Sequence, residues 1–247
     1  MWFFRFIAAA AVLLFMQAED IGADRAPETK SNARVVTFSA RAYDISTGRW
    51  IYTEYHRQYF RNGRHVYSTV HYRRPDGSLL VYKILFYRNE PPAPDFRSVD
   101  KRNGYRQSVV RRGGRRLLSV QRGAKGAVER RLVRIPAPVV VDAGFDYFIK
   151  LNWDRLMTGR TVIANFAVPG KLDFFRFEIK KTRESVRRGR AVAHFRIRTA
   201  SVFLRLFAEN IDLVYDRHTR RLLVYTGISN ITAPGGEEYR ARIVFRY

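Results

Sequence analysis

A glutamate and two histidines on neighbouring predicted strands are the residues of this sequence best suited to bind a metal. The Asn-Gly pair in "RNGR" (61–64) is typical of a two-residue hairpin loop, and counting outward from it places Glu54, His56 and His71 on one sheet face. Zinc is ligated by these residue types, but usually with cysteines or histidines at matched spacings, which the sequence lacks. We therefore expect no metal and no cofactor, and we expect both histidines to face water.

The opposite face of the same predicted hairpin is aromatic and aliphatic. It carries Tyr55, Tyr59, Val66, Val70 and Tyr72. Strands that are half buried place their apolar residues on the covered face. The pattern therefore predicts that this face is the buried one.

The motifs of common enzyme classes are absent from the sequence. It contains no G-x-S-x-G elbow, no H-E-x-x-H, no glycine-rich phosphate loop and no cysteine. Most carboxylates stand beside predicted turns or helix caps. We therefore expect no catalytic residues and a protein that is not an enzyme. A hydrolase of an envelope polymer remains an alternative, because paired carboxylates can converge from distant strands.

Most of the chain alternates apolar and polar residues with the period of two that indicates β-strands. "STGR", "RNGR" and "PDGS" separate the first strands, each with glycine where a tight hairpin needs a positive φ. This pattern predicts a mainly β fold, a long antiparallel meander curved into a half-barrel or open barrel. The predicted strands are 35–45, 50–60, 65–73, 79–88, 104–112, 115–122, 127–135, 161–169, 171–181, 190–200, 211–216, 220–231 and 239–247, and 201–210 is predicted to be a short helix or turn.

One segment, "DAGFDYFIKLNWDRLMTG" (142–159), has the apolar spacing of an amphipathic helix instead. Asp142 is positioned as its N-cap and Gly159 as the residue that ends it. Acidic residues share its polar face with Lys150 and Arg155, whereas a helix lying on a membrane would carry mainly basic residues there. We expect this one helix to lie at the centre of the fold, wrapped by the sheet.

A curved sheet with an apolar helix inside it can enclose a ligand cavity. Arginines at the border of such a cavity would suit an amphiphile with an anionic head. The alternative is that the helix simply fills the concave side of the sheet. The residues predicted to line the cavity are Phe145, Phe148, Ile149, Trp153, Tyr55, Tyr59, Phe175 and Phe177.

The first residues have the layout of a secretory signal, with Arg5 before an apolar run at 6–16. The run is short for a membrane span, and no later segment is apolar enough, so no transmembrane span is expected after cleavage; an uncleaved anchor is the alternative. We expect a signal peptide at 1–23, cleaved after Ala18 or Ala23, a flexible leader at 24–34, and a single half-barrel domain at 35–247. The expected location is the periplasm.

The net charge of +24 predicts an anionic partner, either a lipid or other amphiphile or an anionic envelope surface. Most of the basic residues are arginine, which is also consistent with a solvated surface or with the base composition of the genome. The expected export and the lack of a groove-reading motif argue against nucleic acid as the binding partner. Without cysteines the fold has no disulfides, so core and sheet must stabilise it.

The hairpins "TGR", "NGR" and "DGS", the segment "DAGFDYFIKLNWDRLMTGRTVIANFAVPGKLDFFRFEI" and "IDLVYDRHTRRLLVYTGISNI" resemble a family of exported bacterial proteins of unknown function. The resemblance covers most of 35–247. This family is similar to the wider group that shares the β half-barrel of the periplasmic lipoprotein carriers. The resemblance implies a periplasmic location and binding of an acyl chain or another amphiphile.

These expectations define three hypotheses about function. The first is a soluble periplasmic protein that binds or carries a hydrophobic or anionic-amphiphilic envelope molecule in a half-barrel cavity. The second is a non-catalytic structural or interaction protein of the envelope that docks on anionic surfaces through its basic face. The third is the polymer hydrolase.

Overall fold

The computed structural model describes residues 32–88, 90–201, 209–232 and 238–247. The predicted signal peptide, nearly all of the predicted leader, and most of the helix or turn expected at 201–210 lie outside these residues. Ala33–Tyr247 forms one compact unit. None of its described helices has the length and apolar character that crossing a bilayer requires.

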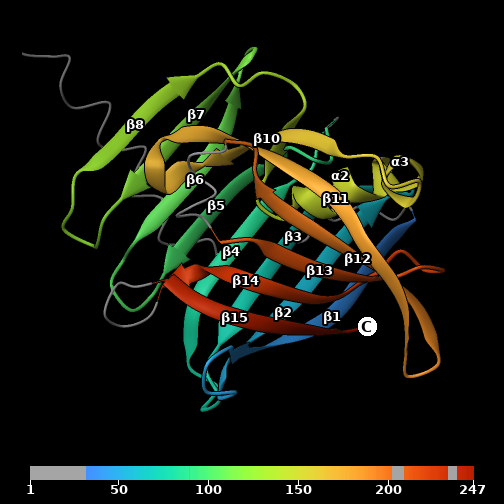
Figure 1. Cartoon of the computed structure of the whole chain (residues 1–247). Helices are drawn as coiled ribbons and strands as arrows, with labels where there is room; N and C mark the ends of the chain where they lie inside the picture. Colours follow the sequence, from blue (N-terminus) through green and yellow to red (C-terminus); the bar gives the residue numbers. More distant parts are fainter. Residues whose placement is uncertain (1–31, 89, 202–208, 233–237) are drawn as a thin grey trace, which may run out of the picture. The chain divides into compact units, whose positions relative to one another are not determined.

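The strands of this unit form a single 15-stranded sheet, whose order is β8-β7-β6-β5-β4-β3-β2-β1-β15-β14-β13-β12-β11-β10-β9 (Figure 1). Neighbouring strands are antiparallel except β9 and β10. The strands are β1 Ala33–Asp44, β2 Trp50–Arg61, β3 Arg64–Arg73, β4 Leu79–Phe86, β5 Asp95–Asp100, β6 Arg106–Arg112, β7 Arg115–Gln121, β8 Val128–Val133, β9 Val139–Val141, β10 Val162–Val168, β11 Asp173–Arg187, β12 Arg190–Thr199, β13 Ile211–Asp216, β14 Leu222–Thr232 and β15 Glu238–Arg246. Among the described residues, β8 and β9 end the sheet without a further partner strand, so the sheet is open, and the predicted mainly β, antiparallel, open architecture is confirmed.

The predicted single helix is two short ones, α2 (Gly144–Leu151) and α3 (Trp153–Met157). Asn152 separates them, and its side-chain amide donates to the carbonyl oxygen of Phe148. Gly159 follows the C-cap with φ +81°, as predicted for the residue that ends the helix. The described residues contain one further helical element, a short 3-10 helix at Pro169–Lys171 between β10 and β11.

Asp142 does not cap the helix, which corrects the prediction. The N-cap position is Ala143, without a side-chain cap hydrogen bond. Asp142 instead has φ +44°, and both of its carboxylate oxygens accept hydrogen bonds from Lys83 Nζ at 3.0 Å. This buried ion pair ties the start of α2 to β4.

The helices pack against strands from both halves of the sheet. Phe148, Ile149, Trp153 and Leu156 belong to a core cluster with residues of β9 to β14. On the other side of α2, the hydroxyl of Tyr147 lies 2.7 Å from Nδ1 of His65 on β3. The prediction that the helical segment lies on the inner, covered face of the sheet is therefore confirmed by its contacts.

The predicted register of the β2–β3 hairpin holds only beside the turn. Arg61 pairs with Arg64 and Phe60 with His65, as predicted, but Val66 is then unmatched, so that Tyr59 pairs with Tyr67. Because the extra residue lies on β3, each β2 residue beyond it pairs one β3 position farther along than predicted, so that Glu54 lies opposite Tyr72 and not opposite His71. The prediction of which β2 face is buried is therefore wrong.

The two faces of β2 have opposite environments. Glu54 is buried on the inner face, with its carboxylate 2.8 Å from Nε2 of His56. Tyr55 lies on the outer face and is 49% exposed. On β3, Val70 and Tyr72 are buried as predicted.

Candidate functional site

The structure brings together five of the eight residues predicted to line a cavity, and a sixth, Phe175, lies on the same face of the sheet. Phe148, Ile149 and Trp153 are buried beside the partly buried Phe145 in the helix-centred core. The predicted β11 residues lie on the same inner face, since Phe175 pairs with Phe166 and Phe177 with Ala164 of the core strand β10. Tyr55 and Tyr59 lie on the opposite, outer face of β2, which removes them from this group.

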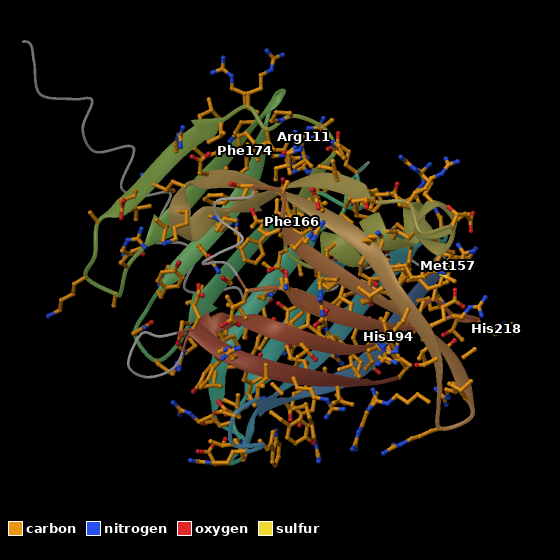
Figure 2. All side chains as sticks on the ribbon, viewed as in Figure 1. Arg111, Met157, Phe166, Phe174, His194 and His218 are labelled. Atoms are coloured by element: carbon orange, nitrogen blue, oxygen red, sulfur yellow. The ribbon has the colours of Figure 1, made fainter. Side chains whose placement is uncertain are left out.

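The helix residues make the contacts of a packed core. The Trp153 ring meets the rings of Phe195 and Tyr215 edge to face, with centroids 5.4 and 5.9 Å apart. Ile149 and Leu156 are fully buried. Phe166 and Phe177, which are only partly buried, pack against this core from β10 and β11, with their ring centroids 5.1 Å apart. Phe166 is labelled in Figure 2.

The three residues considered as zinc ligands do not come together. Glu54 and His56 partner each other on the inner face, whereas His71 points outward beside Tyr82, with ring centroids 5.1 Å apart. The described residues contain no cluster of three or more metal-ligating side chains.

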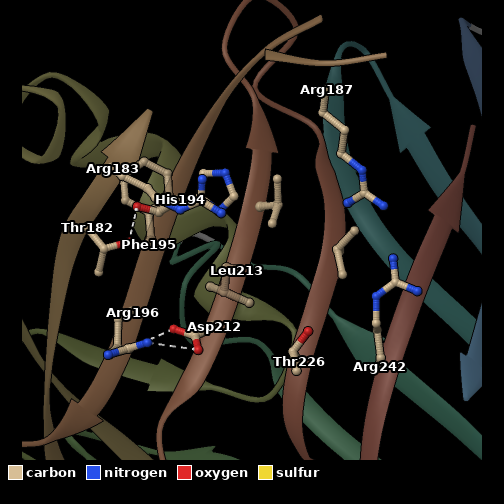
Figure 3. A pocket seen from close by; sticks show the side chains of 12 residues that line it. Thr182, Arg183, Arg187, His194, Phe195, Arg196, Asp212, Leu213, Thr226 and Arg242 are labelled. Atoms are coloured by element: carbon tan, nitrogen blue, oxygen red, sulfur yellow. Dashed lines mark hydrogen bonds and ion pairs between the residues drawn. The ribbon is translucent and has the colours of Figure 1, made fainter. Parts of the chain in front are cut away.

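A pocket of about 300 Å³ lies on the outer face of β11 to β15, and it was not predicted (Figure 3). The inner-facing side chains of β12 and β13, such as Phe195 and Leu213, pack on the helices. Their neighbours in sequence therefore point the other way, into the pocket. The pocket is lined by Thr182, Arg183, Arg187, His194, Phe195, Arg196, Asp212, Leu213, Val214, Val224, Thr226 and Arg242.

A β-bulge in β11 places the arginines on this face. Lys181 pairs with Phe195 and Arg183 with His194, so that Thr182 is the extra residue. Before the bulge, Lys181 reaches the helices and donates to the carbonyl oxygen of Met157. After it, Arg183 and Arg187 share the outer face with His194, because a single inserted residue exchanges the faces of a strand.

The charges in the pocket are strongly unbalanced. Asp212 is the one carboxylate among the lining residues, and Arg196 donates to both of its oxygens, at 2.7 and 3.1 Å. In the part of the chain that the structure describes, Arg183, Arg187 and Arg242 have no carboxylate within 4.0 Å. Figure 3 shows the guanidinium groups of Arg187 and Arg242 pointing toward one another across the pocket.

His194 lies on the floor of this cationic pocket. Its Nε2 is 2.9 Å from Oγ of Ser185, which is two residues beyond Arg183 on β11. Burial lowers the pKa of His194 below its ordinary value, and the positive charges of Arg183 and Arg187 lower it further, against a smaller opposing effect of Asp212. The imidazole is therefore neutral at neutral pH.

Three guanidinium groups around one hollow are suited to an anion with oxygens on several sides. Arginine binds carboxylate, phosphate and sulfate groups through paired N–H donors. One arginine can satisfy a planar carboxylate, as Arg196 does for Asp212. A tetrahedral oxyanion can use donors from β11 and β15 at once.

Sequence reasoning missed this pocket because its position depends on the bulge at Thr182. Read without the bulge, Arg183 and Arg187 pair with the buried face of β12. The available signal was that "TRESVRRGR" (182–190) continues the strand 171–181 to a glycine-containing turn, which predicts a longer strand with basic residues near its end.

No protein-family model and no curated protein matches the chain. One solved structure, described as a beta-barrel-like protein of domain of unknown function DUF1849 from Brucella abortus, is similar with a TM-score of 0.47 and 8% sequence identity. The similarity covers 86% of this chain and 96% of that chain.

Proposed function

We propose that this protein is a non-catalytic binding protein for a tetrahedral oxyanion, phosphate or sulfate, carried by a molecule of the bacterial envelope. The observation that carries the proposal is the set of three guanidinium groups, those of Arg183, Arg187 and Arg242, which line one pocket without a carboxylate partner among the described residues. Like charges that face one another repel, and an anion between them removes this cost. The positive net charge supports it by attracting anions over longer distances.

The envelope setting is part of the proposal. The signal-like start of the sequence, Arg5 followed by an apolar run, supports export to the periplasm. There, phosphate groups are offered by phospholipid headgroups and by lipopolysaccharide. Cell fractionation of the tagged full-length protein tests this setting, and recovery of the protein in the cytoplasm would contradict it.

The arginine pocket and the apolar helix face do not form one amphiphile site. They lie on opposite faces of β11 to β15, because Phe195 and Leu213 pack on the helices while Arg196 and Asp212 point outward. A single ligand therefore cannot place its head among these arginines and its acyl chain beside Trp153. This separates the anion hypothesis from the carrier hypothesis.

A second candidate function is carriage of an acyl chain on the inner face. The observation that favours it is the partly exposed Phe166–Phe177 pair, which continues the apolar surface of the helix-centred core. Native mass spectrometry of protein purified from the periplasm under mild conditions tests it. A ligand-free protein that also fails to take up added lipids would exclude this function.

The experiment for the leading proposal compares binding of a soluble anion, an anionic lipid surface and a neutral lipid surface. Inorganic phosphate, vesicles with an anionic phosphatidylglycerol fraction, and neutral phosphatidylcholine vesicles are titrated against the mature protein at fixed ionic strength. We expect binding of phosphate and of anionic vesicles only, weakened by salt. Binding of vesicles without any binding of soluble phosphate would contradict a discrete pocket and favour a diffuse basic surface.

A further inference from the structure

We propose that anion binding in the arginine pocket is coupled to protonation of His194, so that the site takes up its anion together with a proton. This inference rests on the proposed function and adds a regulation to it. The geometry that carries it is the position of one titratable imidazole among the same guanidinium groups that would hold the ligand.

Among the described residues, the His194 imidazole has a hydrogen-bond partner at one of its two nitrogens. Nε2 of His194 lies 2.9 Å from the Ser185 hydroxyl, whose single proton can be donated to it or turned away from it. A hydroxyl can accept as well as donate, so the same contact serves both the neutral and the protonated ring. Protonation therefore requires no rearrangement of the strands.

The charged groups that face His194 come from every neighbouring strand. On β11, Arg183 is the residue paired with His194, and on β13 the paired residue is the uncharged Val214. Asp212 is committed to Arg196, and Asp216 accepts hydrogen bonds from the backbone amides of the following turn. The charged groups that line the pocket with His194 are Arg183 and Arg187 from β11, Arg196 from β12, Asp212 from β13 and Arg242 from β15, whereas Asp216 lies farther along β13, opposite Val192.

In the free pocket this environment opposes a charged imidazole. Burial and the two β11 arginines both lower the pKa of His194. A bound dianion cancels the positive charge of the arginines and adds negative charge beside the ring, which raises that pKa. By linkage, a group whose pKa is higher in the bound state makes binding stronger as the pH falls from the bound-state pKa toward the free-state pKa.

The size of the effect has an upper limit. One proton taken up per anion changes the affinity by at most about tenfold per pH unit. Three fixed arginine charges bind the anion at any pH near neutrality, since guanidinium does not lose its proton. His194 therefore adjusts the affinity, and it does not switch the site on or off.

Inorganic sulfate is the appropriate probe, because it stays a dianion across the relevant range and any pH dependence then belongs to the protein. The His194 imidazole signal is followed by NMR through a pH titration, with and without saturating sulfate. Sulfate affinity is measured by calorimetry at about pH 5.5 and about pH 7.5, at constant ionic strength, around the ordinary histidine pKa. His194→Asn removes the titrating group, and His218→Asn is the matched control at the turn after β13, outside the pocket (Figure 2).

We expect the pKa of His194 to rise on sulfate loading, and sulfate to bind at least about threefold more tightly at the lower pH. The gradient should disappear in His194→Asn and persist in His218→Asn. An unchanged pKa of His194 on loading, or a gradient that survives His194→Asn, would overturn the coupling while leaving anion binding intact. Absence of sulfate binding at both pH values would instead overturn the proposed function itself, and the coupling with it.

Discussion

Arg196 donates from Nε and Nη2 to the two carboxylate oxygens of Asp212, at 2.7 and 3.1 Å, across the β12–β13 pair. This bidentate pairing uses the one carboxylate among the lining residues of the pocket. The positive charges of Arg183, Arg187 and Arg242 consequently remain available for an external anion. Because Arg196 neutralises Asp212, the presence of this acid in the pocket is compatible with the proposed binding of an anion.

Asp212→Asn should strengthen anion binding. The substitution releases Arg196 and removes the one carboxylate among the described residues that line the pocket, so we expect sulfate affinity to rise by about two- to fivefold, which corresponds to about 0.5–1 kcal/mol. Because Arg196 and Asp212 are both nearly half exposed, the free energy of unfolding should fall by less than about 1 kcal/mol. Calorimetry with sulfate and urea denaturation measure the two effects, and weaker binding in the variant would count against the assigned role of Asp212.

Tyr147→Phe should destabilise the fold through His65. The hydroxyl of Tyr147 is the partner of His65 Nδ1, and Ser68 occupies Nε2 at 2.8 Å. Removing one partner leaves a buried ring nitrogen unsatisfied, at a cost of about 1–3 kcal/mol in the free energy of unfolding. Tyr59→Phe, on the outer face of β2, is the matched control and should change stability by less than about 0.5 kcal/mol. Equal effects of the two substitutions in urea denaturation would show that the His65 contact adds nothing.

Acid should weaken the fold through the same histidine. Burial lowers the pKa of His65 to about 4, and Lys150 lowers it too, whereas the unfolded chain has the ordinary value of 6.5. Between these values the unfolded state binds more protons, so the free energy of unfolding decreases as the pH falls from 6.5 toward about 4. His65→Asn cannot titrate, so its unfolding free energy should be less dependent on pH in this window. A slope identical to that of the wild type would assign the acid sensitivity to other groups.

Lys83→Met should be among the more damaging single substitutions. Lys83 and Asp142 form a nearly buried ion pair between β4 and the start of α2, and removing the lysine takes its positive charge away from the carboxylate. We expect a loss of about 3 kcal/mol or more in the free energy of unfolding. The double variant Lys83→Met/Asp142→Asn should recover part of that loss, because the negative charge that Lys83 paired with is gone and asparagine tolerates the positive φ of this position. No recovery in the double variant would mean that the two residues act independently.

The positions of the strands could be predicted from the sequence more reliably than which face of each strand is buried. Alternation and glycine turns identify most strands, because strand pairing through short hairpins is a local property. The missed strands are β5 (Asp95–Asp100), which follows a proline-rich segment and carries charged residues at both ends, and the three-residue β9. Both depend on neighbours far along the chain, and local patterns do not encode such pairing.

The errors about sites share one physical cause, which is the β-bulge. Val66 and Thr182 are each the unmatched residue of a bulge within a long strand pair. Valine and threonine are common in regular strands, so neither residue type indicates a bulge. The first bulge places Glu54 opposite the buried Tyr72 and Tyr55 opposite the outward His71, so that Tyr55 and Tyr59 lie on the outer face and Glu54 and His56 on the inner one. The second turned Arg183 and Arg187 toward the outer face and created the pocket. By contrast, the helical stripe of Phe148, Ile149 and Trp153 could be predicted, because helical periodicity is continuous over the segment.

The central claim is tested most directly by calorimetric titration of inorganic sulfate into the triple variant Arg183→Gln/Arg187→Gln/Arg242→Gln. The control is Arg61→Gln/Arg64→Gln/Arg112→Gln, which removes the same charge from exposed hairpin ends outside the pocket. We predict that the pocket variant binds sulfate at least about tenfold more weakly than the wild type, because charge-assisted hydrogen bonds are lost, and that the control changes affinity by less than about threefold. Equal weakening in both variants would contradict a discrete site and leave only the overall positive charge of the protein.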